Sequence, residues 1–138
     1  MANLAFLLCG LPGPAYHGGA ITCWGIIKAM VARGHEVTVL SLFDNSNGNP
    51  YLSSKETQVK DLLNIGAHVE LLEFNHQNLS RLNTFLEKIG SVFQPDLEKF
   101  FPWSTLRPSV QKKLADIKPS AVFCYHFDAL SAVYGTDI

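Results

Sequence analysis

The sequence predicts a single three-layer α/β domain in which helices cover both faces of a parallel sheet. Short apolar segments alternate along the chain with longer segments of helical periodicity, and this alternation is typical of parallel sheets. The composition agrees, because 47% of the 138 residues are hydrophobic and 17% are charged, which favours a buried core and excludes a disordered chain. The length corresponds to about one domain.

The first half of the chain predicts two strands joined by a helix. Asn3–Cys9 is a continuous apolar run that stops at a glycine, which indicates a strand buried on both faces. Apolar residues recur at helical spacing over Ala20–Arg33, and Gly34 supplies the left-handed position that ends a helix. Glu36–Phe43 is rich in β-branched residues and predicts a second strand, whereas Asp44–Pro50 is a dense turn cluster.

The second half continues the alternation. The predicted elements are, in order, a helix over Ser54–Asn64, a strand over Ala67–Phe74, and helices over Leu79–Ile89 and Ser104–Ile117, followed by a strand over Ala121–Tyr125 and the start of a helix over Phe127–Tyr134. Ser104 is the predicted N-cap of its helix, and Pro119 ends that helix. Phe93–Trp103 contains two prolines and several large aromatic residues, and the pattern assigns it no element.

Right-handed crossovers between four parallel strands favour the Rossmann-like spatial order 3-2-1-4. In that order the chain reverses its direction across the sheet between the first and fourth strands, and ligands of such sheets bind there, beyond the carboxyl ends of the strands. The glycine-rich loop Gly10–Gly19 follows the first strand, and His126 begins the loop after the fourth. The topology therefore predicts that this loop and His126 meet in one crevice.

Gly18 and Gly19 lie directly before the first helix. Glycines at a helix N-terminus let backbone N–H groups approach a ligand closely and favour a negative charge, so a phosphate group is the predicted ligand. Neither a Walker motif nor the G-x-G-x-x-G dinucleotide motif is present, because the residues after Gly18 and the spacing of Gly10 and Gly13 do not fit. The alternative is that these glycines form only a tight strand-to-helix turn.

Two stretches of the chain carry a resemblance to a known family. HGGAITCWGIIKAMVARGHEVTVLSL, which starts at His17, resembles the amino-terminal signature of the retaining GT-B glycosyltransferases of family 4 (glycosyltransferase group 1), in which Gly-Gly-Ala follows the first strand and Arg-Gly-His-Glu-Val-Thr-Val enters the second. KPSAVFCYHFDALSAV is similar to the family's strand that ends in a histidine facing the donor sugar, with Ser120 in place of the usual Asp and His126 at the histidine. Tyr51–Ser109 matches only in element order.

The resemblance implies a retaining transferase that moves a sugar from a nucleotide-activated donor to an acceptor. No cofactor and no metal are predicted. By this resemblance, Gly18 and Gly19 would place backbone donors near the diphosphate or the acceptor, and His126 would hydrogen-bond the donor sugar and help to stabilise charge at its anomeric carbon. His17 is a further candidate substrate contact because it lies beside Gly18. The alternative for His126 is an ordinary polar residue at the rim of the sheet, and the alternative for His17 is a solvated loop histidine.

Family members carry a second, donor-binding domain with basic residues that hold the diphosphate and a Glu-x7-Glu signature, and nothing in the 138 residues resembles either. The resemblance therefore implies that residues 1–138 are an incomplete, acceptor-side first domain of a truncated GT-B fold, inactive on its own. A different class of function stays open, a stand-alone Rossmann-like domain that binds a nucleotide or phosphate without transferase activity.

Charge and cysteine content exclude several other functions. Eleven basic and twelve acidic residues give a net charge of −1 without a basic cluster, so no nucleic-acid partner is expected. Cys9, Cys124 and His126 invite a thiol-nucleophile or metal-site interpretation, but the two cysteines end apolar strands and are predicted to be buried and inert. No metal site is predicted. Three sparse cysteines and the lack of a secretory signal or membrane span predict a cytoplasmic protein.

Two further expectations concern surfaces. The aromatic segment Phe93–Trp103 either covers an edge of the core, lines an acceptor groove, or makes peripheral contact with a membrane, and the sequence leaves these open. Ala121–Tyr125 carries no charge or proline to protect a sheet edge, so it predicts self-association through that edge.

Overall fold

The computed structural model describes residues 1–15, 18–75, 103–125, 129–130 and 132–133. The helix predicted over Leu79–Ile89 lies outside the described residues. So do Phe93–Trp103, apart from Trp103 itself, and most of the helix predicted over Phe127–Tyr134.

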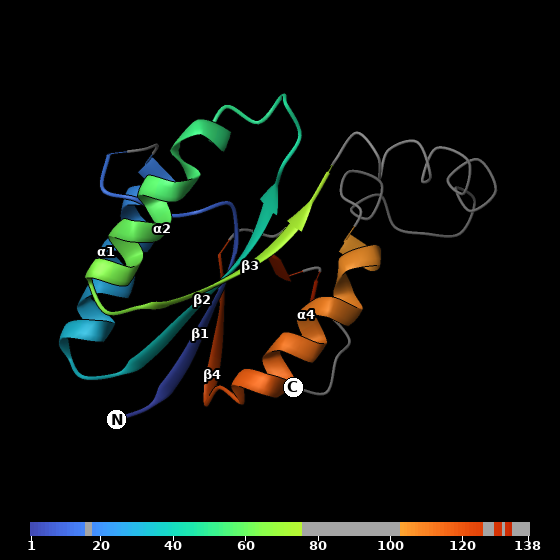
Figure 1. The fold of residues 1–138 in the computed structure, drawn as a ribbon. Helices are drawn as coiled ribbons and strands as arrows, with labels where there is room; N and C mark the ends of the chain where they lie inside the picture. The colour runs from blue at the N-terminus through green and yellow to red at the C-terminus, as the bar shows by residue number, and fades with distance from the viewer. Residues whose placement is uncertain (16–17, 76–102, 126–128, 131, 134–138) are drawn as a thin grey trace.

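A four-stranded, all-parallel sheet forms the centre of the domain (Figure 1), and its order β3-β2-β1-β4 confirms the predicted topology. The strands are β1 (Asn3–Cys9), β2 (Glu36–Asp44), β3 (His68–Phe74) and β4 (Ala121–Tyr125). The bounds of β1 and β4 are those predicted, and the other two differ by one residue at one end. The sequence was sufficient here because each strand is an apolar run between clear breakers.

Among the described residues the structure gives bounds for α1 (Gly18–Ala32), for α2 (Lys55–Asn64), preceded by the single turn η1 (Leu52–Ser54), and for α4 (Trp103–Ile117). The predicted N-cap is wrong, because α4 begins at Trp103 and Ser104 lies inside the helix. Helix α1 also begins two residues earlier than predicted, so that Gly18 and Gly19 are its first residues. Both glycines of the predicted phosphate site thus belong to the helix itself.

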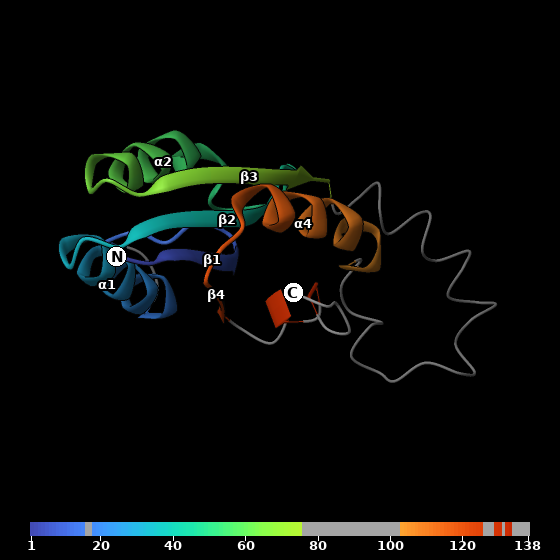
Figure 2. The same cartoon turned by 90° about the horizontal axis from the view of Figure 1, so that it is seen from below.

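Two apolar cores, one on each face of the sheet, make the three layers (Figure 2). Because side chains alternate along a strand, β1 contributes Leu4, Phe6 and Leu8 to the core under α1 and α2, and Ala5 and Leu7 to the core under α4. The prediction that this strand is buried on both faces is confirmed. An ion pair of 2.7 Å between Lys113 on α4 and Glu70 on β3 adds a contact at the margin of the second core.

Gly34 and Gly66 end the two helices that precede β2 and β3, and both have left-handed backbones with φ of +80° and +89°. At Gly66 an added Cβ would lie 3.3 Å from the Val31 side chain, whereas at Gly34 it would meet no described atom within 4 Å. Alanine substitutions at these two positions therefore distinguish two contributions to stability: the cost of a left-handed alanine backbone and the cost of steric contact with Val31.

Gly66→Ala is expected to lower the free energy of unfolding by about 2–3 kcal/mol, because it combines a left-handed alanine, which costs about 1–2 kcal/mol, with displacement of the Val31 methyl group. Gly34→Ala should cost only the backbone part. Urea denaturation of both variants measures the difference. Equal losses of stability in the two variants would show that the Val31 side chain moves aside without a measurable loss of stability.

Strand β4 lies at one edge of the described sheet and pairs only with β1 within the described residues. Phe123 at its centre is 41% exposed and stacks on Phe6 with ring centroids 4.9 Å apart. The predicted position of this strand is confirmed, and self-association through it stays a prediction.

Candidate functional site

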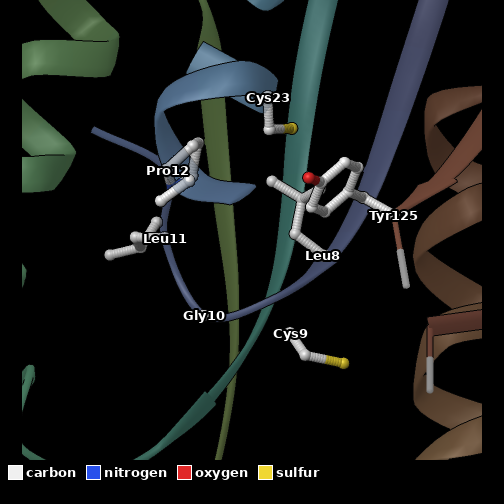
Figure 3. Close-up of a pocket in the computed structure, with 8 residues that line it drawn as sticks. Leu8, Cys9, Gly10, Leu11, Pro12, Cys23 and Tyr125 are labelled. Carbon is white, nitrogen blue, oxygen red and sulfur yellow. The ribbon is translucent and has the colours of Figure 1, made fainter. Parts of the chain in front are cut away.

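All four strands are parallel, so their carboxyl ends meet at one edge of the sheet. The register places Leu8 of β1 opposite Tyr125 of β4, and the loop that follows β1 therefore starts beside the last residue of β4. A small open hollow with a cavity volume of about 30 Å³ lies at this junction (Figure 3), and its walls are Leu8, Cys9, Gly10, Leu11, Pro12, Ala20, Cys23 and Tyr125. The hollow occupies the position where the topology predicts a ligand crevice.

The first part of the glycine-rich loop is fixed by hydrogen bonds to β2 and α2. Gly10 has a φ of +88°, a conformation that favours glycine. Its N–H donates to the Leu42 carbonyl at 3.0 Å, and its own carbonyl accepts from the buried Ser41 hydroxyl at 2.8 Å. The Gln58 side-chain amide donates to the Leu11 carbonyl at 3.5 Å. Gly10 is therefore needed for the fold of the loop.

The walls of the hollow are mostly apolar. Leu8, Tyr125 and Cys23 project toward a common space (Figure 3). Leu11 and Pro12 are buried, and a proline carries no N–H. Burial raises the pKa of the Cys23 thiol from 9.0 to about 11, so this side chain is an uncharged wall at neutral pH.

The buried Cys23 thiol makes stability depend on alkaline pH. Between about pH 9 and pH 11 the unfolded chain loses this thiol proton while the folded chain keeps it, so the contribution to stability is complete below pH 9 and falls as the pH rises. We expect the urea midpoint of the wild type to fall more between about pH 8 and pH 10 than that of Cys23→Ala. Cys9→Ala, which changes an exposed thiol, is the control and should follow the wild type. If the urea midpoints of Cys23→Ala and of the wild type fall equally between these pH values, the Cys23 thiol is not the source of the pH dependence.

The second part of the loop leads into the N-terminus of α1. Gly18 is exposed and Gly19 is half-buried. The first four N–H groups of a helix have no partner within the helix and favour an anion, and no acidic side chain lies in the first turn of α1. Gly18 does not have a left-handed backbone, and an added Cβ there would meet no described atom within 4 Å. Unlike Gly10, it is not needed by the described fold.

The two histidines of the predicted site, His17 and His126, lie outside the described residues. Their immediate neighbours are described. Gly18 follows His17 at the start of α1, and Tyr125, which precedes His126, is a wall of the hollow. The structure thus brings the start of the glycine loop and the end of β4 together, and the roles of both histidines stay predictions.

The cysteines differ in part from expectation. Cys9, predicted to be buried, is exposed at the carboxyl end of β1. Cys124 is half-buried, and burial raises the pKa of its thiol. The register pairs Cys124 with Leu7 and Cys9 with Leu42, so the two cysteines are not opposite each other. Among the described residues, no three His, Cys, Asp or Glu side chains gather as a metal site would require.

A second polar group lies at the carboxyl ends of β2 and β3. The two carboxylate oxygens of Asp44 accept the Ser46 N–H at 2.9 Å and the Ser46 hydroxyl at 2.8 Å, which fixes the turn after β2. Glu73 pairs with Lys55 and accepts from the Asn45 amide at 2.6 Å. The hydrogen bond from Lys55, followed by that from Asn45, lowers the pKa of Glu73. This group stabilises the turn, and its carboxylates are already bonded within the chain.

Sequence reasoning missed three residues around the hollow. Tyr125 was predicted only as the end of a strand. Ser41 is a polar residue inside an apolar strand, and Gln58 precedes Leu62 by four residues and so shares its buried helix face. A buried polar residue needs a partner, and that rule would have drawn attention to Ser41 and Gln58 as contacts of the glycine loop.

No helix among the described residues has the length and apolar character that crossing a membrane requires. No protein-family model, no curated protein and no solved structure matches the chain.

Proposed function

We propose that this chain forms the acceptor-side, amino-terminal domain of a nucleotide-sugar-dependent, retaining glycosyltransferase, and that its crevice lies between the N-terminus of α1 and the end of β4. Gly18 and Gly19 place backbone N–H groups toward a negatively charged part of the substrate, and His126 faces the donor sugar. The sequence of residues 1–138 contains no cluster of basic side chains that could neutralise a diphosphate. In this proposal a separate donor-binding domain therefore supplies most of the affinity for the diphosphate.

The observation that carries the proposal is the contrast between Gly10 and Gly18. The left-handed backbone of Gly10 explains its glycine as part of the fold. Gly18 has neither a left-handed backbone nor a described atom within 4 Å of an added Cβ, so the turn alone does not require a glycine there. Close approach of a ligand to the helix N-terminus would explain a glycine there. The resemblance of the surrounding residues to the family signature supports the same conclusion.

A stand-alone dinucleotide-binding domain is the alternative, and Asp44 argues against it. Rossmann dinucleotide sites use an acidic side chain in the region of the second strand to bind the ribose hydroxyls. Asp44 is the acidic residue at the carboxyl end of β2, and its two carboxylate oxygens are bonded to Ser46. The absence of G-x-G-x-x-G from the sequence agrees with this argument.

Gly18→Ala tests the proposal. Its effect on stability should stay within about 0.5 kcal/mol, as for an ordinary surface change. Its affinity for a nucleotide sugar should fall by about tenfold, because a methyl group at the helix N-terminus keeps the phosphate away from the backbone N–H groups. Titration of UDP-, GDP- and ADP-sugars by calorimetry or NMR measures both proteins.

Gly48→Ala is the matched control. Gly48 is an exposed glycine in the turn after β2, and an added Cβ there also meets no described atom within 4 Å. This variant should bind nucleotide sugars as the wild type does. Unchanged binding by Gly18→Ala would show that Gly18 is only a turn residue and would remove the main support for the proposal.

A further inference from the structure

Two buried polar side chains from different elements donate hydrogen bonds to consecutive carbonyl groups of the glycine-rich loop. The Ser41 hydroxyl on β2 donates to the Gly10 carbonyl at 2.8 Å, and the Gln58 amide on α2 donates to the Leu11 carbonyl at 3.5 Å. Ser41 is 0% exposed and Gln58 is 1% exposed. Only the nitrogen of a glutamine amide can donate to a carbonyl, so the contact with Leu11 also determines how the Gln58 amide is oriented.

Packing alone does not explain a glutamine at position 58. Gln58 shares the buried face of α2 with Leu62, and an apolar side chain of similar length, such as methionine, would fill the same space. The Gln58 Oε1 atom is buried and has no hydrogen-bond partner among the described residues, which lowers stability. What the glutamine provides, and an apolar residue does not, is the hydrogen bond to the Leu11 carbonyl. Positions where a sequence gives up stability in this way are typical of functional sites.

Leu11 connects Gln58 to the first turns of α1. The Leu11 side chain is 7% exposed and belongs to the same core cluster as Cys23 of α1. Leu11, Cys23 and Ala20 also line the same hollow, and Ala20 directly follows Gly19 in the helix. Because close-packed side chains transmit displacements, a shift of Leu11 changes the surface against which the start of α1 packs.

We propose that Gln58 is a positioning residue of the crevice. By holding the Leu11 carbonyl, it places the loop against the start of α1 and so orients the N–H groups of Gly18 and Gly19 toward the anionic part of the substrate. Gln58 acts through Leu11 and not by contact with the substrate, because its side chain is buried. The effect on substrate rests on the proposed function, whereas the effect on the position of the helix N-terminus does not.

Gln58→Met tests this role because it removes the hydrogen bond to Leu11 and the unpaired oxygen together. Its urea midpoint should stay close to that of the wild type, since these two changes offset each other. In the ligand-free chain, the amide NMR signals of Gly18, Gly19 and Ala20 should nevertheless shift. Among UDP-glucose, GDP-mannose and ADP-glucose, the affinity for the probe that the wild type binds best should fall about fivefold, the equivalent of one neutral hydrogen bond.

Leu62→Met, one turn further along the same buried face of α2, is the matched control and should leave the Gly18, Gly19 and Ala20 signals and the affinity unchanged. Gln58→Asn, whose shorter side chain cannot reach the Leu11 carbonyl, should reproduce the shifts of Gln58→Met and replaces it if that variant does not fold. Unchanged signals at the start of α1 in the Gln58 variants, or equal shifts in the control, would overturn the inference. Shifted signals in these variants, together with no nucleotide-sugar binding by the wild type, would support the coupling of Gln58 to α1 and contradict the proposed function.

Discussion

Phe43→Ala is expected to lower the free energy of unfolding by about 3–5 kcal/mol. Phe43 lies on the central strand β2, is 0% exposed, and belongs to the core under α1 and α2. The Lys55 ammonium group also lies 5.2 Å from the centre of its ring, and truncation removes that cation–π contact as well. Such a loss is a large part of the stability of a domain of this size.

Phe123→Ala provides the matched control, because Phe123 belongs to the same sheet but lies on the edge strand and is 41% exposed. Its loss should be about 1 kcal/mol, most of it from stacking on Phe6. Urea denaturation of both variants measures the difference. Similar losses would contradict the expectation that the burial of each ring determines the cost of its truncation.

His126→Ala is expected to lower turnover by about 100-fold or more when the chain acts together with a donor-binding domain. A hydrogen-bond donor aimed at developing charge contributes an effect of this size. We expect stability to change by no more than about 0.5 kcal/mol, as for an ordinary surface substitution. Release of nucleotide from the donor, measured per folded molecule, gives the turnover.

His68→Ala is the matched control for this prediction. His68 begins β3, its side chain is exposed, and it lies at the amino end of the sheet, opposite the crevice. Turnover of this variant should equal that of the wild type. If His126→Ala instead unfolds the domain and leaves the turnover of the remaining folded molecules unchanged, His126 has a structural role and not a catalytic one.

The sheet could be predicted from the sequence because its strands are marked by local features. Asn3–Cys9 and Ala121–Tyr125 are apolar runs between breakers, and the handedness of crossovers then leaves few strand orders. The start of α4 could not be predicted in the same way. Ser104 is a typical N-cap residue, but the helix extends one residue further, to Trp103.

The candidate site was predictable in position and less so in composition. Topology alone places the glycine loop beside the end of β4. It does not show which glycines the backbone requires, and only the dihedral angle of Gly10 and the open space at Gly18 separate their roles. The exposure of Cys9 also depends on what packs against the carboxyl edge of the sheet. Such tertiary packing cannot be predicted from a short apolar run of residues.

An amide NMR map of the chain titrated with UDP-, GDP- and ADP-sugars tests the central claim most directly. The account predicts weak binding, with a Kd of about 1 mM or higher, and shifts at Gly18, Gly19 and Tyr125 for at least one donor. The turn after β2 around Ser46 should not respond. Shifts confined to that turn, or micromolar binding by the chain alone, would contradict the claim that this crevice binds the substrate and that a donor-binding domain supplies most of the affinity.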